Sequence, residues 1–267
     1  MTSNRGEGGL EKLEIPQPRP SKQVQPDPST EEELESDCLI CHGAGVVHPV
    51  ENGRVDYSQV ITCGCMKDMV LKQRRDLLIK MCELPAGTTK WTFENFQVDK
   101  RWPSLKEAKD AALALAEEKD DTRWLSLLSR ADRGKSHLAV AICRRWLERG
   151  KPARYILVPM MLDELRRGYS KEGEDSYDLK LNFIMNVDLL VLDDIGAQVP
   201  TPWAMEKLMM IIDHRSVNDL PLVVTTNKEL KNLPGDDEHR IGSRLLRFTA
   251  SWHVTIEAPE YRTWRKE

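Results

Sequence analysis

The sequence lacks any apolar run long enough to span a bilayer. Its polar N-terminus also lacks the hydrophobic core of a signal peptide, so we expect a cytoplasmic protein with no membrane partner. Basic residues are not in excess, since the net charge is −4 and the pI is near 6.0. Such a chain has no global attraction to nucleic acid, so any DNA contact must come from a local patch.

The length and composition indicate a soluble globular protein. A chain of 267 residues accommodates one sizeable domain and an appendage, and 40% hydrophobic with 31% charged residues fits this class. Residues 1–36 differ from the rest, because they contain five prolines among Gln, Ser, Lys and Glu and have almost nothing to bury. We therefore predict a disordered tail over 1–36.

A glycine-lysine-serine segment stands between a strand-like and a helix-like stretch. Residues 124–129 are apolar enough for a strand, and residues 138–147 are apolar at helical spacing. At a turn from strand to helix, backbone N–H groups can hold phosphates, a lysine can reach the β and γ groups, and a serine hydroxyl can ligate Mg²⁺. The predicted nucleotide-binding residues here are Arg133, Gly134, Lys135, Ser136 and His137.

A second segment, Leu189-Leu190-Val191-Leu192-Asp193-Asp194, is an apolar run that ends in paired carboxylates. This pattern is typical of a central buried strand whose tip presents one aspartate to a metal ion and another to water. Each segment alone is a weak signal, but together they predict a P-loop ATPase that uses ATP and Mg²⁺.

The phosphate loop lacks two glycines that the usual signature contains, and Ser129 and Asp132 take their places. Aspartate tolerates positive φ better than most residues. Its carboxylate would repel a triphosphate unless it turns outward or pairs with Arg130 or Arg133. These departures favour nucleotide binding over fast hydrolysis.

Strands and helices alternate along residues 153–227, which predicts an α/β fold with a parallel sheet covered on both faces, an αβα sandwich. The carboxyl ends of neighbouring strands then face one crevice. Lys135, Asp193, Asp194 and Asn227 all fall at or just beyond strand ends, so they could converge on one γ-phosphate. Asn227 could instead be only a turn former.

Four of the six cysteines, Cys38, Cys41, Cys63 and Cys65, lie within 28 residues. Strand-like stretches between the two pairs flank Asn52-Gly53, a dipeptide that favours a type I′ hairpin turn. Pairing about that turn would follow i + j = 105 and would place Cys41 opposite Gly64. The hairpin therefore predicts that the two thiol pairs meet.

Several chemistries fit such a cluster. Disulfides are disfavoured in the cytosol. Cys38 and Cys41 with His42 match a haem attachment motif, but a haem would leave Cys63 and Cys65 unexplained. Tetrahedral Zn²⁺ uses all four thiolates, so we predict a closed, structural zinc site, with a redox pair or coincidence as the alternatives.

Residues 67–80 are predicted to form a helix with a basic face that is either simply solvated or contacts phosphates. The aromatic segment 91–96 either packs as a core edge or borders the adenine. The predicted domain organisation is a tail over 1–36, a zinc-binding module with the basic helix over 37–82, a linker with the aromatic segment over 83–103, and an ATPase domain over 104–267.

Several motifs together resemble the AAA+ ATPases of the DnaC/DnaI helicase-loader group. The residues that carry this resemblance are Phe93-Glu-Asn-Phe96, Gly134-Lys-Ser-His-Leu-Ala139, Leu190-Val-Leu-Asp-Asp-Ile-Gly196, Thr225-Thr-Asn227 and Arg240-Ile-Gly-Ser-Arg-Leu245. The similarity covers about residues 90–267, and a four-cysteine module before the Phe-Glu-Asn-Phe segment recurs in that group. IstB-type transposition helper ATPases share nearly the same core.

The resemblance implies roles for matching residues. Lys135 and Ser136 would be Walker A, and Asp193 and Asp194 Walker B, with Asp194 as the water-activating acid. Asn227 would be sensor 1. Arg244 would be an arginine finger acting on a neighbouring subunit's ATP, with Arg240 as its rival. Arg262 or Arg265 would be sensor 2, unless they belong only to a basic tail, and the lid of larger AAA+ proteins would be absent or vestigial.

The function expected from this resemblance is an ATPase that self-assembles, contacts single-stranded DNA and helps to load a replicative DNA helicase, which the zinc module would contact. Two alternatives stay open: a transposition helper of the same fold, and a non-hydrolysing adaptor that uses a degenerate P-loop as a scaffold.

Overall fold

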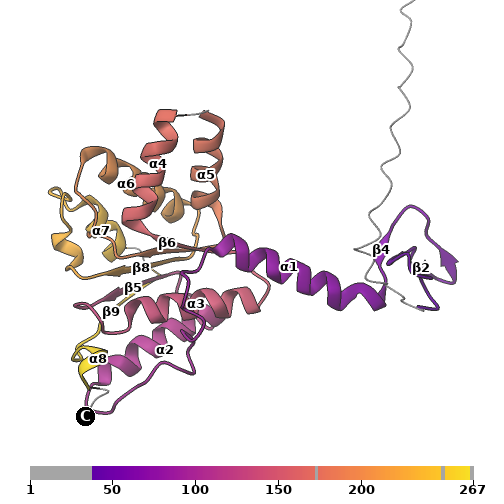
Figure 1. Ribbon diagram of the computed structural model, residues 1–267, viewed down its shortest axis with the longest axis horizontal. Helices are drawn as coiled ribbons and strands as arrows, with labels where there is room; N and C mark the ends of the chain where they lie inside the picture. The colour runs from indigo at the N-terminus through magenta and orange to yellow at the C-terminus, as the bar shows by residue number, and fades with distance from the viewer. Residues whose placement is uncertain (1–37, 172–173, 248–249, 265–267) are drawn as a thin grey trace, which may run out of the picture. The chain divides into compact units, whose positions relative to one another are not determined.

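The computed structural model describes residues 38–171, 174–247 and 250–264, so the predicted tail over 1–36 and Arg265 lie outside the described residues. Contacts between Cα atoms divide the chain into two units, Met1–Met66 and Lys67–Glu267, which are described separately below (Figure 1). No helix within the described ranges is long and apolar enough to cross a membrane.

Five parallel strands form the sheet of the second unit, in the order β6-β7-β8-β5-β9 (Figure 1). The strands are β5 (Trp124–Leu128), β6 (Ala153–Leu157), β7 (Leu189–Asp193), β8 (Leu222–Thr226) and β9 (Ser251–Thr255). All of β7 and β8 is buried, as expected for strands covered on both faces. The predicted α/β class with a central parallel sheet is confirmed.

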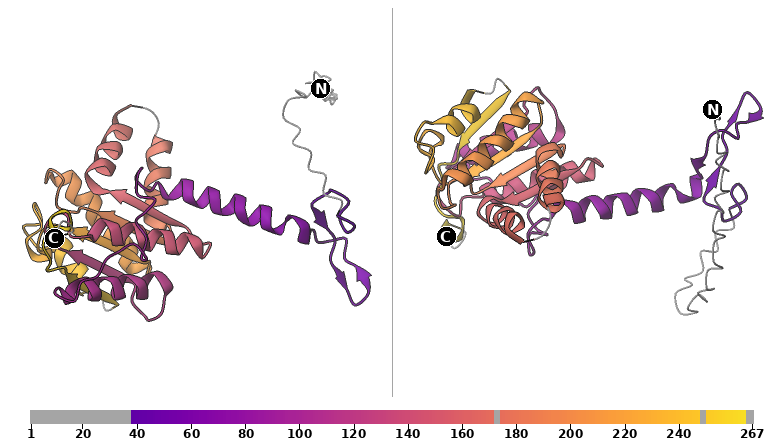
Figure 2. Two further views of the ribbon diagram at one scale, coloured as in Figure 1. Left: turned by 60° about the horizontal axis from the view of Figure 1, so that its bottom comes forward. Right: turned by 90° about the horizontal axis from the view of Figure 1, so that it is seen from above.

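Side chains that alternate along each strand supply two separate cores. Leu189 and Val191 of β7 pack with α2 (Pro103–Glu117) and α3 (Lys135–Glu148) on one face. Leu190 and Leu192 pack on the other face with the helices that follow β6 in the chain. Because successive side chains of a strand point to opposite faces, one continuous apolar run fills both cores. Figures 1 and 2 show these helix layers above and below the sheet.

Helices of the second face are α4 (Val158–Lys171), α5 (Glu174–Asn186), α6 (Pro202–Val217) and α7 (Arg240–Arg247). A short 3-10 turn, η2 (Leu230–Asn232), lies between β8 and α7. The sequence did not predict α5 or β9. In the described residues that follow β9, the only helix is α8 (Tyr261–Trp264), one turn long.

The basic helix α1 (Lys67–Cys82) belongs to the second unit. The sequence grouped it with the cysteine module, but Leu78 and Cys82 near its C-terminal end are buried in the core that α3 also lines. Burial of these two residues joins the helix to the ATPase unit, so the unit begins at Lys67 and not at residue 104.

The first unit contains two small antiparallel ladders. Strands β2 (Val50–Glu51) and β3 (Arg54–Val55) pair about Asn52-Gly53 with the predicted register, because Val50 faces Val55. Strands β1 (Val46–Val47) and β4 (Ile61–Thr62) pair with Val46 facing Thr62, a sum of 108. The predicted register of 105 is therefore wrong beyond the first ladder.

A local turn at Asp56 accounts for the shift. The Asp56 carboxylate accepts hydrogen bonds from the Ser58 backbone N–H at 2.9 Å, the Ser58 hydroxyl at 2.6 Å and the Gln59 amide at 3.0 Å. This turn takes up three extra residues on one arm of the hairpin. The arms nevertheless realign, since the Cys63 N–H donates to the Gly45 carbonyl at 2.9 Å, and a 3-10 turn, η1 (Gly64–Met66), follows.

Candidate functional site

The loop between β5 and α3 has the backbone geometry of a phosphate loop. Gly134 adopts φ +90° as the N-cap of α3, and a Cβ added there would lie 2.6 Å from the Phe96 ring. A larger residue would thus meet both backbone strain and a clash. Asp132 adopts φ +56°, the left-handed conformation that the sequence expected aspartate to tolerate at this position. The loop leaves the first N–H groups of α3 facing the cavity described below.

Lys135, the first residue of α3, is buried and directed back along the loop. Its ammonium donates to the carbonyl oxygens of Ser129 at 3.0 Å and Arg130 at 2.9 Å. It also lies 3.1 Å from Ser129 Oγ and 2.8 Å from Asn227 Oδ1 beyond β8. Burial lowers the pKa of Lys135, and the carboxylates of Asp194 and Asp193 partly oppose this shift. An ammonium held by oxygen atoms here can exchange them for phosphate oxygens.

Asp193 at the end of β7 collects hydroxyl groups from three elements. Its Oδ1 accepts from Ser136 Oγ at 3.1 Å and from Thr225 Oγ1 at 2.6 Å, and its Oδ2 accepts from the buried Tyr155 hydroxyl. Burial is the main cause that raises the pKa of Tyr155 far above its usual range, so its hydroxyl stays protonated and donates. A carboxylate beside a P-loop serine fits a Mg²⁺ site, because hard cations prefer oxygen ligands.

Asp194 turns away from its neighbour. It adopts φ +60°, its N–H donates to Thr225 Oγ1 at 2.9 Å, and its Oδ1 accepts from Asn227 Nδ2 at 2.9 Å. Burial first, and then the charge of Asp193, raise the pKa of Asp194. A carboxylate with a raised pKa is a better base toward water than an ordinary one. The structure thus brings together the four residues that the sequence placed at strand ends.

A cavity of about 290 Å³ lies against the loop. Gly134, Lys135 and Ser136 line its polar end, and apolar side chains such as Phe96 and Ala258 line the rest. Its size is close to the lower end of small-molecule sites, about 300 Å³. Both alternatives for the aromatic segment hold, since Phe93 and Phe96 are buried in the core while Trp91 and Phe96 also line the cavity.

His137 attaches the aromatic segment to the first turn of α3. Its ring stacks on Trp91 with centroids 5.8 Å apart, meets Phe96 edge-on at 5.4 Å, and places Nε2 2.8 Å from the Thr92 carbonyl oxygen. Burial lowers the pKa of His137, so the neutral ring donates its Nε2 proton to that carbonyl. His137 therefore shapes the cavity wall and does not extend the phosphate loop.

The charged residues flanking the loop differ from the expected pairing. The Asp132 carboxylate contacts neither Arg130 nor Arg133; instead it accepts from the Arg262 backbone N–H at 3.1 Å and lies 3.6 Å from Arg262 Nε. Arg133 lines the cavity, and its buried Nε has no hydrogen-bond partner within the described ranges. Arg262 also lines the cavity, so of the two sensor 2 candidates it is the one that can be placed.

The two arginine-finger candidates lie on α7, away from this cavity's lining. Arg244 is half-buried, forms an ion pair with Asp213 of α6 and donates to the Arg240 carbonyl at 3.1 Å. Arg240 is exposed, and its guanidinium forms no hydrogen bond or ion pair with other described residues. Arg240 is thus available to a neighbouring subunit as it stands, whereas Arg244 must first leave Asp213.

The sequence did not single out Tyr155 or Thr225 as ligands of Asp193. Tyr155 faces Val191 across the parallel ladder of β6 and β7, two positions before Asp193. The available signal was a phenol within an apolar strand next to the aspartate-bearing strand. Recognising it requires knowing which two strands are neighbours.

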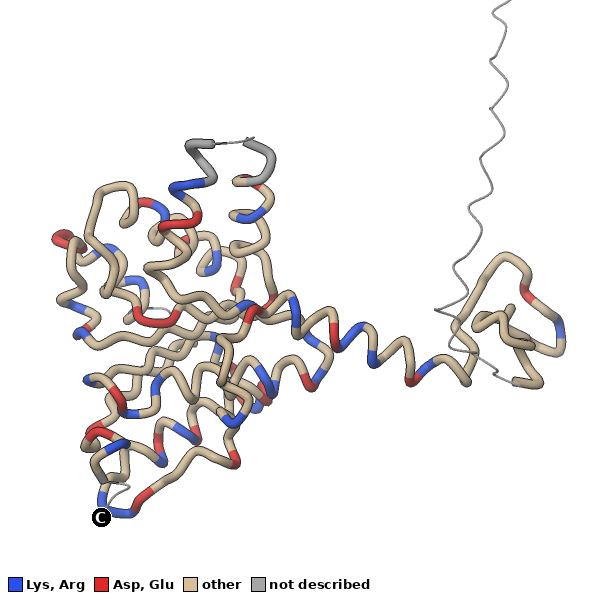
Figure 3. The backbone as a smooth tube through the Cα atoms, viewed as in Figure 1, with Lys and Arg blue, Asp and Glu red and all other residues tan. Residues whose placement is uncertain are grey.

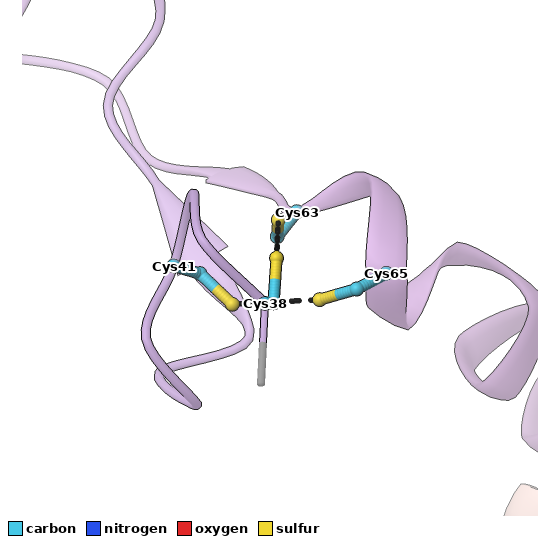
Figure 4. Close-up of side chains that lie close together, drawn as sticks. All are labelled: Cys38, Cys41, Cys63 and Cys65. Atoms are coloured by element: carbon cyan, nitrogen blue, oxygen red, sulfur yellow. Dashed lines mark hydrogen bonds between the residues drawn. The ribbon is translucent and has the colours of Figure 1, made fainter. Parts of the chain in front are cut away.

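The four cysteine thiols of the first unit meet as predicted, despite the altered register (Figure 4). Their sulfur atoms all lie within 4.8 Å of one another, with Cys38 and Cys63 3.7 Å apart and Cys41 and Cys65 3.4 Å apart. None is in a disulfide. Four sulfurs bound tetrahedrally to Zn²⁺ at about 2.3 Å would be about 3.8 Å apart, so the cluster fits the ion.

Backbone N–H groups around the cluster favour thiolates. Hydrogen bonding from the backbone of Cys41 and Ile40 lowers the pKa of Cys38 to about 6, and the Gly45 backbone lowers that of Cys41. The Cys65 pKa is raised, chiefly by its contact with the Cys41 thiol. Four adjacent thiolates repel one another, so complete ionisation requires a bound cation. His48 is not a fifth ligand, because its Nδ1 bonds the Gln59 carbonyl at 2.7 Å.

Comparison with known proteins places this site in a family. Residues 46–246 match the family of IstB-like ATP binding proteins, which is well over half of the chain. The chain belongs to the IstB-like ATP-binding family. It is 32% identical over 173 residues to the replicative helicase loader DnaC of Escherichia coli strain K12, covering 64% of this chain and 69% of that protein.

Two further comparisons agree with this assignment. This IstB-like chain is 23% identical over 237 residues to the phage-like element PBSX protein XkdC of Bacillus subtilis, with 84% of each chain covered. The crystal structure of the DnaC helicase loader superposes with a TM-score of 0.56 at 21% identity, covering 65% of this chain and all of the other. The DnaC-type AAA+ fold is confirmed.

The cysteine cluster generates the first prediction. Protein purified without chelator should contain one zinc per chain by elemental analysis, and replacing Cys38, Cys41, Cys63 and Cys65 together with serine should remove it. Since the ligands are thiolates, zinc affinity should fall as the pH is lowered. A metal-free protein that stays folded with reactive thiols would contradict the zinc assignment.

Asp194 generates a prediction about stability. Its pKa is raised on folding, so its charged form is disfavoured in the native state and destabilises the fold at neutral pH. Asp194→Asn should raise Tm at pH 7, because Asn also tolerates positive φ and can accept from Asn227. The gain should shrink as the pH falls toward about 4, where the carboxyl is protonated in both states.

Asp193→Asn is the matched control at the neighbouring position. Because Asp193 accepts three hydroxyl hydrogen bonds, the amide should lower Tm. If Asp194→Asn lowers Tm at pH 7 as much as the control does, burial of the Asp194 charge does not destabilise this site.

Proposed function

We propose that this protein is a replicative helicase loader that binds ATP with Mg²⁺, hydrolyses ATP, assembles with itself and contacts single-stranded DNA. The observation that carries the proposal is the meeting of Lys135, Ser136, Asp193, Asp194 and Asn227 at the carboxyl edge of the sheet, in a chain of the IstB-like ATP-binding family. The similarity to a protein named as a replicative helicase loader supports the choice of partner.

The site's residues fit ATP·Mg²⁺ in defined roles. The first N–H groups of α3 and the Lys135 ammonium would hold the phosphates, and Ser136 with Asp193 would hold Mg²⁺, which neutralises charge on the transferred phosphoryl group when bound. Tyr155 and Thr225 keep the Asp193 carboxylate oriented. Asn227 holds the Asp194 carboxylate, which would accept a proton from the attacking water.

Contacts to DNA and to the helicase would use surfaces away from the phosphates. The five basic residues of α1 are all exposed, and Figure 3 shows them along the helix. They offer the local patch that an acidic protein needs for single-stranded DNA. The zinc module is the proposed helicase contact by resemblance to related loaders.

A pull-down against the replicative helicase of the same host, with and without ATP, tests the proposed partner. Retention of the helicase supports loading. Failure to retain it, together with binding to a transposase encoded nearby, would support the transposition helper that shares this core.

Two substitutions separate nucleotide binding from turnover. Lys135→Ala removes at least two charge-assisted hydrogen bonds of about 1.5–3 kcal/mol each and should reduce ATP affinity at least about 100-fold. Asp194→Asn should keep binding and stop hydrolysis, because Asp193 remains for the metal. If the wild type has no affinity for ATP in the presence of Mg²⁺, the adaptor with a degenerate P-loop is the better assignment.

An arginine supplied in trans makes hydrolysis depend on assembly. An arginine finger contributes about 10³ or more to turnover, so Arg244→Ala should bind ATP nearly normally but hydrolyse it at a rate lower by that factor. Subunits with Lys135→Ala retain their arginines and should restore hydrolysis when mixed with Arg244→Ala subunits. If they do not, although wild type assembles and turns over, Arg240 is the next candidate, and its exposed guanidinium makes the same mixing test informative.

A further inference from the structure

Asp132 occupies a position that the usual phosphate loop fills with glycine, yet it is not idle. Its backbone carbonyl accepts from the Tyr261 N–H at 2.7 Å, and its carboxylate accepts from the Arg262 N–H at 3.1 Å. The Arg262 guanidinium lies 3.6 Å away but is 86% exposed, so the ion pair itself adds little. The two backbone hydrogen bonds are therefore the attachment, and they join positions about 130 residues apart in the chain.

The segment that Asp132 holds is one wall of the cavity. Ala258, Pro259, Tyr261 and Arg262 line it, opposite Trp91 and Phe96 of the aromatic segment. His137 attaches the aromatic wall and Asp132 attaches the C-terminal wall, so two residues of the phosphate-binding turn hold both sides. A planar apolar group would fit between the walls while its phosphates rest on Lys135 and Ser136.

We propose that Asp132 is a positioning residue for the nucleoside: it holds the segment 258–262 against the phosphate loop as the wall that contacts the base of a bound nucleoside triphosphate. This inference rests on the proposed ATP binding. In the described part of the chain after β9 only one turn of helix follows, so this short segment supplies the covering surface that larger AAA+ proteins take from a lid. The aspartate thus exchanges some phosphate affinity, lost by repulsion, for affinity toward the base.

The proposal and its simplest rival differ in sign. If Asp132 is only a departure from the glycine signature, Asp132→Gly removes a negative charge beside the phosphates, suits φ +56° and should tighten ATP binding. If Asp132 holds the base wall, Asp132→Gly should weaken ATP binding about fivefold or more, the scale of one hydrogen bond to a charged group. Inorganic triphosphate, which has no base, should bind the variant as tightly as wild type or tighter.

Two further variants refine the test. Asp132→Asn keeps a side-chain oxygen for the Arg262 N–H and tolerates positive φ, so it should bind ATP at least as tightly as wild type. Asp219→Gly is the matched control, because Asp219 also has a positive φ of 51° and an arginine 3.6 Å away, Arg123, but lies before β8, at the opposite edge of the sheet. It should bind both ligands as wild type does.

The measurement is the dissociation constant of ATP·Mg²⁺ and of inorganic triphosphate for each variant, by calorimetry or competition, with Tm as the check on folding. Hydrogen exchange should show the Arg262 amide exchanging faster in Asp132→Gly, and ATP slowing exchange over 258–262 in the wild type. Tyr261→Ala, which keeps the backbone attachment and removes a wall side chain, should weaken ATP and spare triphosphate.

The outcomes are distinguishable. ATP binding by Asp132→Gly that equals or exceeds wild type overturns the positioning role and leaves ATP binding intact. Equal losses for ATP and triphosphate also overturn it, because the effect is then on the phosphate loop. A wild type that binds neither ligand contradicts the proposed function itself.

Discussion

The Lys135 ammonium is the interaction on which the site depends. Buried at the start of α3, it needs oxygen partners, and it finds them at the ends of two neighbouring strands: Ser129 and Arg130 after β5, and Asn227 after β8. Asn227 in turn holds Asp194, and Ser136 beside the lysine holds Asp193. One buried cation thus links three parallel strands, and the whole sheet is needed to place it. Removing the lysine removes the reason for these polar groups to meet, so site geometry and fold stability are coupled here.

The surroundings of the phosphate loop follow from the same economy of elements. The turn that would bind phosphates also fixes the two cavity walls, through His137 to the aromatic segment and through Asp132 to the C-terminal segment. A small AAA+ unit can in this way border a nucleotide on several sides with residues drawn from both ends of its second unit. The cysteine cluster is independent of this arrangement, because a two-ladder hairpin with a few paired residues cannot bury a core and needs a bound metal to be stable.

Much of the fold could be predicted from local patterns, and the failures have physical causes. The strand ends bearing Lys135, Asp193 and Asn227 were found because parallel strands share a carboxyl edge, a rule that needs no knowledge of strand order. The hairpin register failed beyond β2 and β3 because the Asp56 turn depends on side-chain hydrogen bonds that alternation does not show. The partners of Asp132 and Arg244 were missed because each lies on an element distant in sequence, Arg262 on α8 and Asp213 on α6. Strand β9 was missed because its half-buried edge position gives no continuous apolar run. Long-range contacts of this kind require the tertiary structure.

The most direct test of the account is a crystal structure with a non-hydrolysable ATP analogue and Mg²⁺. The account predicts that the Lys135 ammonium exchanges the carbonyl oxygens of Ser129 and Arg130 for β- and γ-phosphate oxygens, with Mg²⁺ at Ser136 and Asp193 and the γ-phosphate facing Asp194 and Asn227. An analogue bound elsewhere, with Lys135 still on its own loop, would contradict it.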